Sequence, residues 1–261
     1  MPVAGIDVGS LSAEAVIMRG DEVLGYSILP TGADSRGAAE KALAVALENA
    51  HMTAGDLAFI VATGYGRISV PFANKRVTEI TCHAKGAHFL FPKTRTVIDI
   101  GGQDSKVIQI DESGRVVDFA MNDKCAAGTG RFLEVMARAL EVDLEAMGDL
   151  SKKSRKHLVI SSMCTVFAES EVVSLIARGE AKEDIISALH ESVAERVSSL
   201  AQRVGVLHQV TMTGGVAKNE GVVRSLGQKL GMPMNIPPEP QIVGALGAAI
   251  ISRELADGAG R

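Results

Sequence analysis

The chain contains no tryptophan, and aromatic residues make up only 3% of its 261 positions. This scarcity argues against a surface that stacks on the bases of single-stranded nucleic acid. The formal charge is -4, so no basic field attracts nucleic acid or an anionic membrane. No apolar run approaches the roughly 20 residues that span a bilayer. The first residues show no secretion signal, and we expect a cytoplasmic protein that binds neither nucleic acid nor membrane.

Cysteine is scarce too, and the odd number of cysteines limits what they can do. Cys82, Cys125 and Cys164 cannot form a fully paired disulfide framework. In a reducing cytosol such residues are core side chains, metal ligands or catalytic thiols. The role of each one therefore has to come from its surroundings.

A pattern at the start of the chain recurs further along it. Asp7 and Gly9 reappear as Asp99 and Gly101, an offset of 92 residues (99 − 7), and both segments read strand, turn, strand, turn, strand. Two copies at so long a spacing indicate two related domains rather than a solenoid. Strand clusters followed by helices in each half predict an α/β fold with mixed sheets. Helices are predicted at residues 38–49, 78–90, 129–140, 170–177, 182–204 and 243–255, and further strands at residues 57–62 and 209–213.

The two Asp-x-Gly turns have the chemistry of a phosphate site. A glycine turn lets backbone N–H groups approach phosphate oxygens without an obstructing Cβ. An aspartate at the strand end can hold Mg²⁺ through water. One such turn is weak evidence, because hairpins use these residues for geometry alone. Two turns in corresponding halves, together with Thr213-Gly214-Gly215, form a far more specific pattern, and neither a Walker loop nor a dinucleotide fingerprint competes with it.

With these residues the chain resembles the actin, sugar kinase and Hsp70 ATPase superfamily. The resemblance implies two duplicated ribonuclease H-like domains that bind ATP or ADP with Mg²⁺. The phosphate loops would be residues 6–13 and 99–106, the adenosine loop residues 213–221, and an interdomain helix would hold residues 244–249. We expect a first domain of residues 1–95, on which the C-terminal helix of residues 240–261 packs, and a second domain of residues 96–239.

The resemblance also assigns residues. Asp7 and Asp99 would position Mg²⁺, and Gln103 would orient the attacking water unless it is only a turn residue. The residues expected to bind nucleotide are Gly9, Ser10, Leu11, Ser12, Gly101, Gly102, Ser105, Lys106, Gly214, Gly215, Lys218, Glu220 and Gly244.

Cys125 and Cys164 each lie immediately before a predicted helix. The N-terminus of a helix carries partial positive charge and unpaired N–H donors, which suit an anionic iron–sulfur cluster. Two thiolates are only half of a four-cysteine site, and a two-fold homodimer would supply the other half. From the residues alone the alternative stays open that both are ordinary buried thiols, because free cysteine is among the most buried residue types.

The segments NDKCAAGTGRF, CTVFAESEV, IDIGGQDSK and ATGYGR are similar to the activator ATPases of 2-hydroxyacyl-CoA dehydratases, also called component A or archerases. These belong to the BadF/BadG/BcrA/BcrD ATPase family, which includes ATPase subunits of benzoyl-CoA reductase. The resemblance covers nearly the whole chain. It implies a homodimer with one bridging 4Fe–4S cluster on Cys125 and Cys164, while Cys82 is expected to be structural.

The same resemblance implies that ATP drives the transfer of one strongly reducing electron to a partner enzyme that contains iron–sulfur clusters. The partner would be a 2-hydroxyacyl-CoA dehydratase, a benzoyl-CoA-type reductase or a double-cubane reductase, and a ferredoxin or flavodoxin would donate the electron. Two departures stand out. Leu11 and Glu14 replace the Thr and Lys that are more usual there, and Gln241 begins a segment that is usually more polar. A small-molecule kinase on the same fold, or a regulatory ATPase whose cysteines are buried or bind Zn²⁺, remains the alternative.

Overall fold

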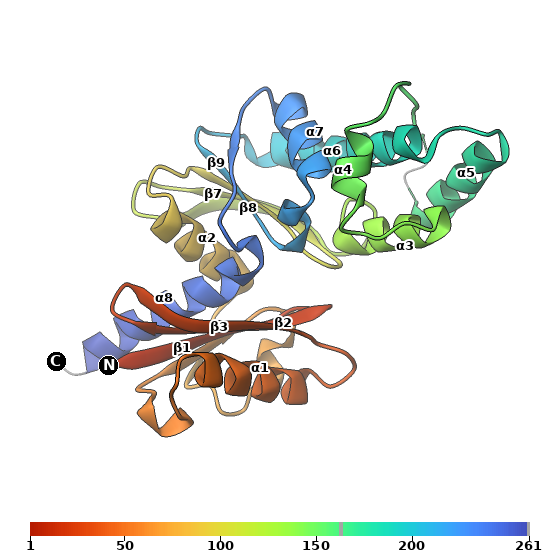
Figure 1. The fold of residues 1–261 in the computed structure, drawn as a ribbon. Helices are drawn as coiled ribbons and strands as arrows, with labels where there is room; N and C mark the ends of the chain where they lie inside the picture. The colour runs from red at the N-terminus through yellow and green to blue at the C-terminus, as the bar shows by residue number, and fades with distance from the viewer. Residues whose placement is uncertain (162–163, 260–261) are drawn as a thin grey trace.

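The computed structural model describes residues 1–161 and 164–259 and shows two five-stranded sheets (Figure 1). The first sheet has the order β3-β2-β1-β4-β5 and the second has the order β10-β9-β6-β7-β8, which is the same arrangement read from the other end. The strands of the first sheet are β1 Pro2–Val8, β2 Ser12–Arg19, β3 Glu22–Pro30, β4 Ile60–Thr63 and β5 Lys75–Arg76. Those of the second are β6 Thr96–Ile100, β7 Ser105–Ile110, β8 Val116–Asn122, β9 Val210–Thr213 and β10 Met234–Asn235.

The connections within the two sheets are also the same. In each sheet an antiparallel meander of three strands comes first, and the first strand then pairs in parallel with the fourth, β1 with β4 and β6 with β9. The predicted duplication and the mixed α/β fold are therefore confirmed.

Helices cover the outer faces of both sheets. In the first domain this helix is α1 (Ser35–Asn49), and in the second it is α6 (Lys182–Val204). Before α6 the second domain has three further helices, α3 (Gly130–Leu140), α4 (Met147–Ser151) and α5 (Thr165–Ala177), and α7 (Glu220–Leu230) follows later. Between these elements lie the short 3₁₀ helices η1 (Ala54–Asp56), η2 (Tyr65–Ser69), η3 (Gly215–Lys218) and η4 (Pro240–Ile242). No helix of the described residues is long and apolar enough to cross a bilayer.

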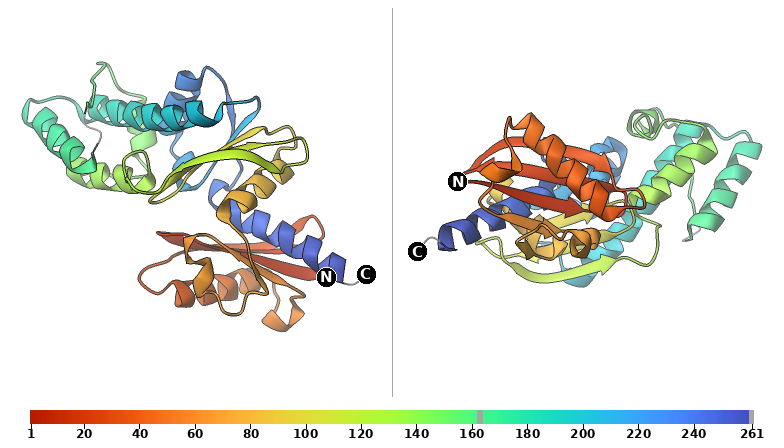
Figure 2. Two further views of the ribbon diagram at one scale, coloured as in Figure 1. Left: turned by 180° about the vertical axis from the view of Figure 1, so that it is seen from behind. Right: turned by 90° about the horizontal axis from the view of Figure 1, so that it is seen from below.

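Two helices cross between the sheets, α2 (Glu79–Leu90) and α8 (Val243–Ala259), as Figure 1 and the left view of Figure 2 show. The helix α2 packs on the second sheet, whereas α8 packs back on the first. A Cβ at Gly247 would lie 1.8 Å from the carbonyl oxygen of Cys82, and one at Gly86 would lie 2.3 Å from that of Val243. Only glycine therefore allows the two helix backbones to come this close.

The alternation of side chains along the strands carries Asp7 and Asp99 toward the space between the domains. On β1, Ala4, Ile6 and Val8 belong to the core under α1, so Asp7 lies on the opposite face. On β6, Ile98 and Ile100 belong to the core of the second domain, so Asp99 faces α2. Each aspartate, one residue before the end of its strand, thus lies on the face that looks toward the other domain.

Most predicted elements are found, with differences at their ends. The helix at residues 182–204 is confirmed as α6, whereas the helix predicted from residue 170 already begins at Thr165. The expectation that Cys125 lies immediately before a helix is wrong, because α3 begins only at Gly130 and a turn at residues 126–129 intervenes. Thr129 is the N-cap residue of α3, and its N–H and hydroxyl both donate to the Ala126 carbonyl, which closes a turn between Cys125 and the helix. Residues 260–261 of the predicted C-terminal helix lie outside the described residues.

Candidate functional site

A cleft of about 1180 Å³ lies between the two domains. Both Asp-x-Gly turns border it, and their backbones have the same geometry. The Gly9 N–H donates to the Ser12 carbonyl over 2.9 Å, and the Gly101 N–H donates to the Asp104 carbonyl over 3.0 Å. The two turns that the sequence singled out thus face one common cavity.

The cleft brings most of the predicted site residues together. Its walls include Asp7, Gly9, Ser10, Leu11, Ser12, Asp99, Gly101, Gly102, Gln103, Lys106, Gly214, Gly215 and Lys218. Three of the residues predicted for the nucleotide site are not on the wall. Ser105 is buried, Glu220 pairs with Lys152 over 2.6 Å, and Gly244 lies behind Asp7, where a Cβ would be 2.0 Å from Oδ2.

His83 on α2 lies between the two aspartates, a place that the sequence did not reveal. Its Nδ1 is 3.4 Å from Asp99 Oδ1 and its Nε2 is 3.8 Å from Asp7 Oδ2, and the Thr213 hydroxyl lies 3.2 Å from Nδ1. The available signal was a histidine on the otherwise apolar buried face of a predicted helix. Only the crossing of α2 between the sheets turns that face toward both carboxylates.

Asp99 is held as a fully paired carboxylate. Lys106 Nζ donates to its Oδ2 over 3.1 Å, and the Thr213 hydroxyl donates to its Oδ1 over 2.9 Å. Burial by itself would raise the pKa of Asp99, but His83, Lys106 and Thr213 outweigh it and lower that pKa to about 2. Lys106 is also paired with Asp104 over 2.8 Å. Burial would lower the pKa of Lys106, yet the two carboxylates raise it, so the ammonium stays charged.

Asp7 has the opposite surroundings. Its cross-strand neighbour is Glu14, whereas the cross-strand neighbour of Asp99 is Lys106. Burial raises the pKa of Asp7 to about 6, and burial together with the charge of Asp7 raises the pKa of Glu14 to about 8. No hydrogen bond reaches the Asp7 carboxylate from the described residues, so its oxygens remain available to a cation, and its hard oxygen donors suit Mg²⁺.

Backbone donors are available at both turns. The N–H groups of Ser10 and Leu11 in the first turn, and of Gly102 and Gln103 in the second, make no hydrogen bond within the described residues. Such free donors beside glycine are the groups that bind phosphate oxygens. The cleft can therefore hold a polyphosphate between the turns, with Lys106 supplying positive charge.

The three cysteines occupy three different environments. Cys82 is buried in a small apolar core with Val61 and Ala248, and burial raises the pKa of its thiol to about 12. Cys125 is half-buried and Cys164 is exposed. Cys164 is the N-cap residue of α5, and its side chain makes no capping hydrogen bond. Across residues 1–161 and 164–259, no group of three or more His, Cys, Asp and Glu side chains is placed to hold a metal ion.

The surface of α5 near Cys164 is apolar. Val166, Phe167 and Val173 are exposed by 66%, 67% and 54%. In both figures α3 and α5 lie at the end of the second domain that is farthest from the chain termini (Figures 1 and 2). An exposed apolar stretch of this kind is typical of a surface that another protein covers.

A direct backbone link joins the second turn to this cysteine-bearing end. The N–H groups of Gly130 and Arg131, at the start of α3, donate to the carbonyls of Gly101 and Gly102 over 2.9 and 2.8 Å. Cys125 lies on the approach to α3, and α3 packs against α5, the helix that Cys164 caps. These two hydrogen bonds therefore connect the second turn directly to the first residues of α3.

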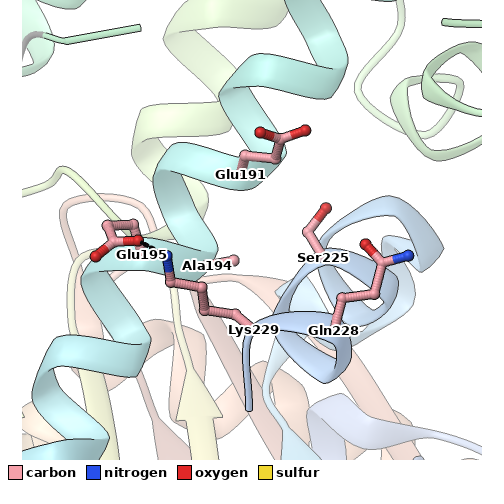
Figure 3. A pocket seen from close by; sticks show the side chains of 6 residues that line it. All are labelled: Glu191, Ala194, Glu195, Ser225, Gln228 and Lys229. Carbon is pink, nitrogen blue, oxygen red and sulfur yellow. Dashed lines mark ion pairs between the residues drawn. The ribbon is translucent and has the colours of Figure 1, made fainter. Parts of the chain in front are cut away.

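A smaller hollow of about 300 Å³ lies between α6 and α7 (Figure 3). Its lining is polar, and Lys229 on α7 pairs with Glu195 on α6. It is separate from both the cleft and the cysteines, and we assign it no role in the chemistry.

Known proteins match the chain over nearly its whole length. A model of the BadF/BadG/BcrA/BcrD ATPase family matches residues 4–252. The (R)-2-hydroxyglutaryl-CoA dehydratase activating ATPase of Acidaminococcus fermentans is 50% identical over 254 residues, which cover 97% of each chain. The activator of lactoyl-CoA dehydratase of Anaerotignum propionicum is 49% identical over 257 residues, which cover 98% of this chain and 99% of the relative.

The solved structures agree. The activator of the 2-hydroxyisocaproyl-CoA dehydratase from Clostridium difficile, determined with bound ADPNP, superimposes with a TM-score of 0.95 at 43% identity and covers 100% of this chain and 97% of its own. A ROK family glucokinase from Streptomyces griseus, at 14% identity and a TM-score of 0.61, covers 97% of this chain and 100% of its own and shares the fold alone.

Proposed function

Because the chain belongs to the BadF/BadG/BcrA/BcrD ATPase family, we propose that it hydrolyses ATP in order to deliver one low-potential electron to an iron–sulfur partner enzyme. The partner is of the 2-hydroxyacyl-CoA dehydratase type, as the names of the relatives support. Cys125 and Cys164 of two copies of the chain would hold one 4Fe–4S cluster, which would supply a one-electron carrier. A ferredoxin or flavodoxin would be the electron donor, and the protein would work in the cytoplasm of an anaerobic cell.

The observation that carries the proposal is the link between the second phosphate loop and α3. Gly101 and Gly102 line the nucleotide cleft, and their carbonyls accept hydrogen bonds from the first two residues of α3. ATP can do work only if it binds two conformations with different affinity. A phosphate loop that moves with the γ-phosphate would move α3, and with it Cys125 and the packed helix α5.

The two cysteines fit half of a cluster site. Both thiols are free, and Cys164 lies at a helix N-terminus whose N–H groups its side chain leaves unbonded. Cys125 and Cys164 would supply two thiolates, and the same residues of a second copy would complete the four. When bound, the cluster supplies a one-electron carrier whose potential responds to nearby dipoles and to exposure.

The exposed face of α5 supports the homodimer. Val166, Phe167 and Val173 place apolar surface beside Cys164, where a second copy would meet the first. A two-fold axis there would bring the two helix ends together, which is the symmetry a shared cluster requires.

Within the cleft, we assign Asp7 and Asp99 different roles. Asp7 would hold Mg²⁺ through water, because no hydrogen bond from the described residues occupies its carboxylate, while Asp99 would fix Lys106 and Thr213 beside the phosphates. Ser10, Leu11, Gly102 and Gln103 would offer backbone N–H groups to the phosphates, and residues 214–218 would border adenosine. Gln103 is exposed in the cleft, so its amide is free to orient the attacking water.

The test separates hydrolysis from electron delivery. The protein is prepared without oxygen, and both ATP hydrolysis and activation of a 2-hydroxyacyl-CoA dehydratase are measured. We expect Cys125→Ser and Cys164→Ser to keep ATP hydrolysis and to lose activation of the dehydratase, whereas the matched control Cys82→Ser keeps both. If either of the first two variants still activates the dehydratase, the proposed electron route is wrong.

A further inference from the structure

Gln241 of η4 lines the cleft and contacts two residues of β2 beside the first phosphate loop. Its Nε2 donates to Ser12 Oγ over 3.0 Å and to Glu14 Oε1 over 3.3 Å. Gln241 and Glu14 lie 227 positions apart in the chain. The contact therefore joins the hairpin of the first domain to the segment that follows the last strand of the second.

The other side of η4 is tied to the adenosine loop. The Gly214 N–H donates to the Pro240 carbonyl over 2.9 Å, and Lys218 Nζ pairs with Glu239 Oε1 over 2.9 Å. The same Glu239 oxygen accepts the Gln241 N–H over 3.1 Å. A continuous set of polar contacts thus runs from the adenosine loop through η4 to the first phosphate loop.

The second domain shows why Glu14 needs such a partner. Lys106 occupies the position that corresponds to Glu14, and it is satisfied inside its own hairpin by Asp99 and Asp104. Glu14 is equally buried, but its cross-strand neighbour Asp7 is also an acid and cannot pair with it. A buried carboxyl needs hydrogen bonds, and besides the Ser12 hydroxyl of its own strand, Gln241 provides one from η4.

We propose that Gln241 is a positioning residue that fixes the first phosphate loop relative to the adenosine loop through Glu14 and Ser12. The two loops that would hold opposite ends of the nucleotide then form one preorganised unit, which favours binding because less conformational freedom is lost when the ligand arrives. The inference rests on the proposed ATP site in the cleft. It makes the first phosphate loop dependent on the distant segment η4, whereas the second loop has the buried ion pairs of Lys106 within its own hairpin.

The test is a mutant cycle read out as nucleotide affinity. Gln241→Ala and Glu14→Ala should each weaken the binding of ADPNP with Mg²⁺ to the full chain, measured by calorimetry, by about tenfold. The double variant should bind no more weakly than Gln241→Ala alone, because that variant already loses the contacts with both Glu14 and Ser12. Gln228→Ala, an exposed glutamine-to-alanine change on α7, is the matched control and should bind as the unaltered chain does.

A second pair of variants, built on Glu14→Lys, separates an effect on nucleotide affinity from an effect on folding. Glu14→Lys rebuilds in the first hairpin the acid–base pair that the second has, so adding Gln241→Ala to it should weaken ADPNP binding less than in the unaltered chain, because only the contact with Ser12 is then lost. Thermal unfolding without nucleotide is measured for every variant. Additive losses in affinity, or coupling seen only in thermal stability, would overturn the positioning role. An unaltered chain that binds no nucleotide would instead overturn the proposed ATP site beneath it.

Discussion

The two halves of the molecule build the same turn between the same pair of strands, yet they fill one position with opposite charges. In the second hairpin Lys106 faces Asp99, and in the first Glu14 faces Asp7. The second site is therefore neutralised from within. The first contains two buried acids whose pKa values are raised, and it depends on a cation or a hydrogen bond from outside.

This difference suggests a division of labour. The second loop is rigidly paired and bonded to α3, so it is suited to pass a movement toward the cysteines. The first loop carries the free carboxylate of Asp7 and is suited to receive Mg²⁺ with its nucleotide. The two domains share the same backbone arrangement, and the residue opposite the aspartate, Glu14 in one and Lys106 in the other, determines the charge of each site.

The largest expected effect is on the paired site. Lys106→Met leaves Asp99 buried without its cation, and we expect it to lower the free energy of unfolding by about 3–5 kcal/mol. The equivalent change in the first hairpin, Glu14→Met, removes a buried acid next to another acid and should cost far less. Urea denaturation of both variants measures this contrast, and equal losses would show that the two sites are not electrostatically different.

The second-largest expected effect concerns the hydrogen bonds that connect each phosphate loop to its neighbouring segment. A Cβ at Gly130 would lie 3.2 Å from the Gly101 carbonyl oxygen, so Gly130→Val wedges α3 away from the second loop. We expect it to lower dehydratase activation per ATP hydrolysed by about tenfold, or ~1.4 kcal/mol of coupling. Thr31→Val removes the hydroxyl that donates to Gly9 over 2.9 Å in the first loop. That variant should weaken nucleotide binding but keep the activation obtained per ATP, so an unchanged ratio for Gly130→Val would refute the α3 link.

The smallest expected effect is a pair of opposite pH dependences. The folded protein holds the proton of Glu14 more tightly than the unfolded chain does, since the pKa rises from its ordinary 4.5 to about 8. The free energy of unfolding should therefore fall as pH rises through that window, by at least ~1 kcal/mol. Asp99 acts the other way, because its pKa is lowered from 3.8 to about 2, so its stabilising effect is present above 3.8 and is lost as pH falls toward 2.

Two variants separate these slopes in urea denaturation without nucleotide or divalent cation. Glu14→Gln should remove much of the decline toward alkaline pH, and Asp99→Asn should remove part of the loss in acid. A Glu14→Gln profile that parallels that of the unaltered chain across its window would mean that Glu14 ionises there without cost.

The sequence revealed those features of the site that depend on local pattern. The repeated Asp-x-Gly turns and the glycine loop at residue 213 predicted the fold and most of the cleft wall, because turn chemistry is local. The start of α5 was placed too late, since Thr165, Val166 and Phe167 have weak intrinsic preference for a helix and packing decides there.

What could not be predicted depends on contacts between distant segments. His83 is unremarkable along the chain and meets both aspartates only because α2 crosses between the sheets. The same holds for Gln241 and Glu14, which were noted separately as unusual residues but whose contact joins segments 227 positions apart in the chain. Burial then raises the pKa of Glu14, and the local sequence pattern does not predict that this residue is buried.

The most direct test of the central claim is the iron and sulfide content of protein purified without oxygen, together with its mass in solution. We expect a coloured homodimer with about two iron and two sulfide per chain, as one 4Fe–4S cluster per pair of chains requires. Cys125→Ala and Cys164→Ala should each abolish the cluster, and Cys82→Ala should retain it. A colourless monomer, or iron that persists in both of the first two variants, would contradict the account.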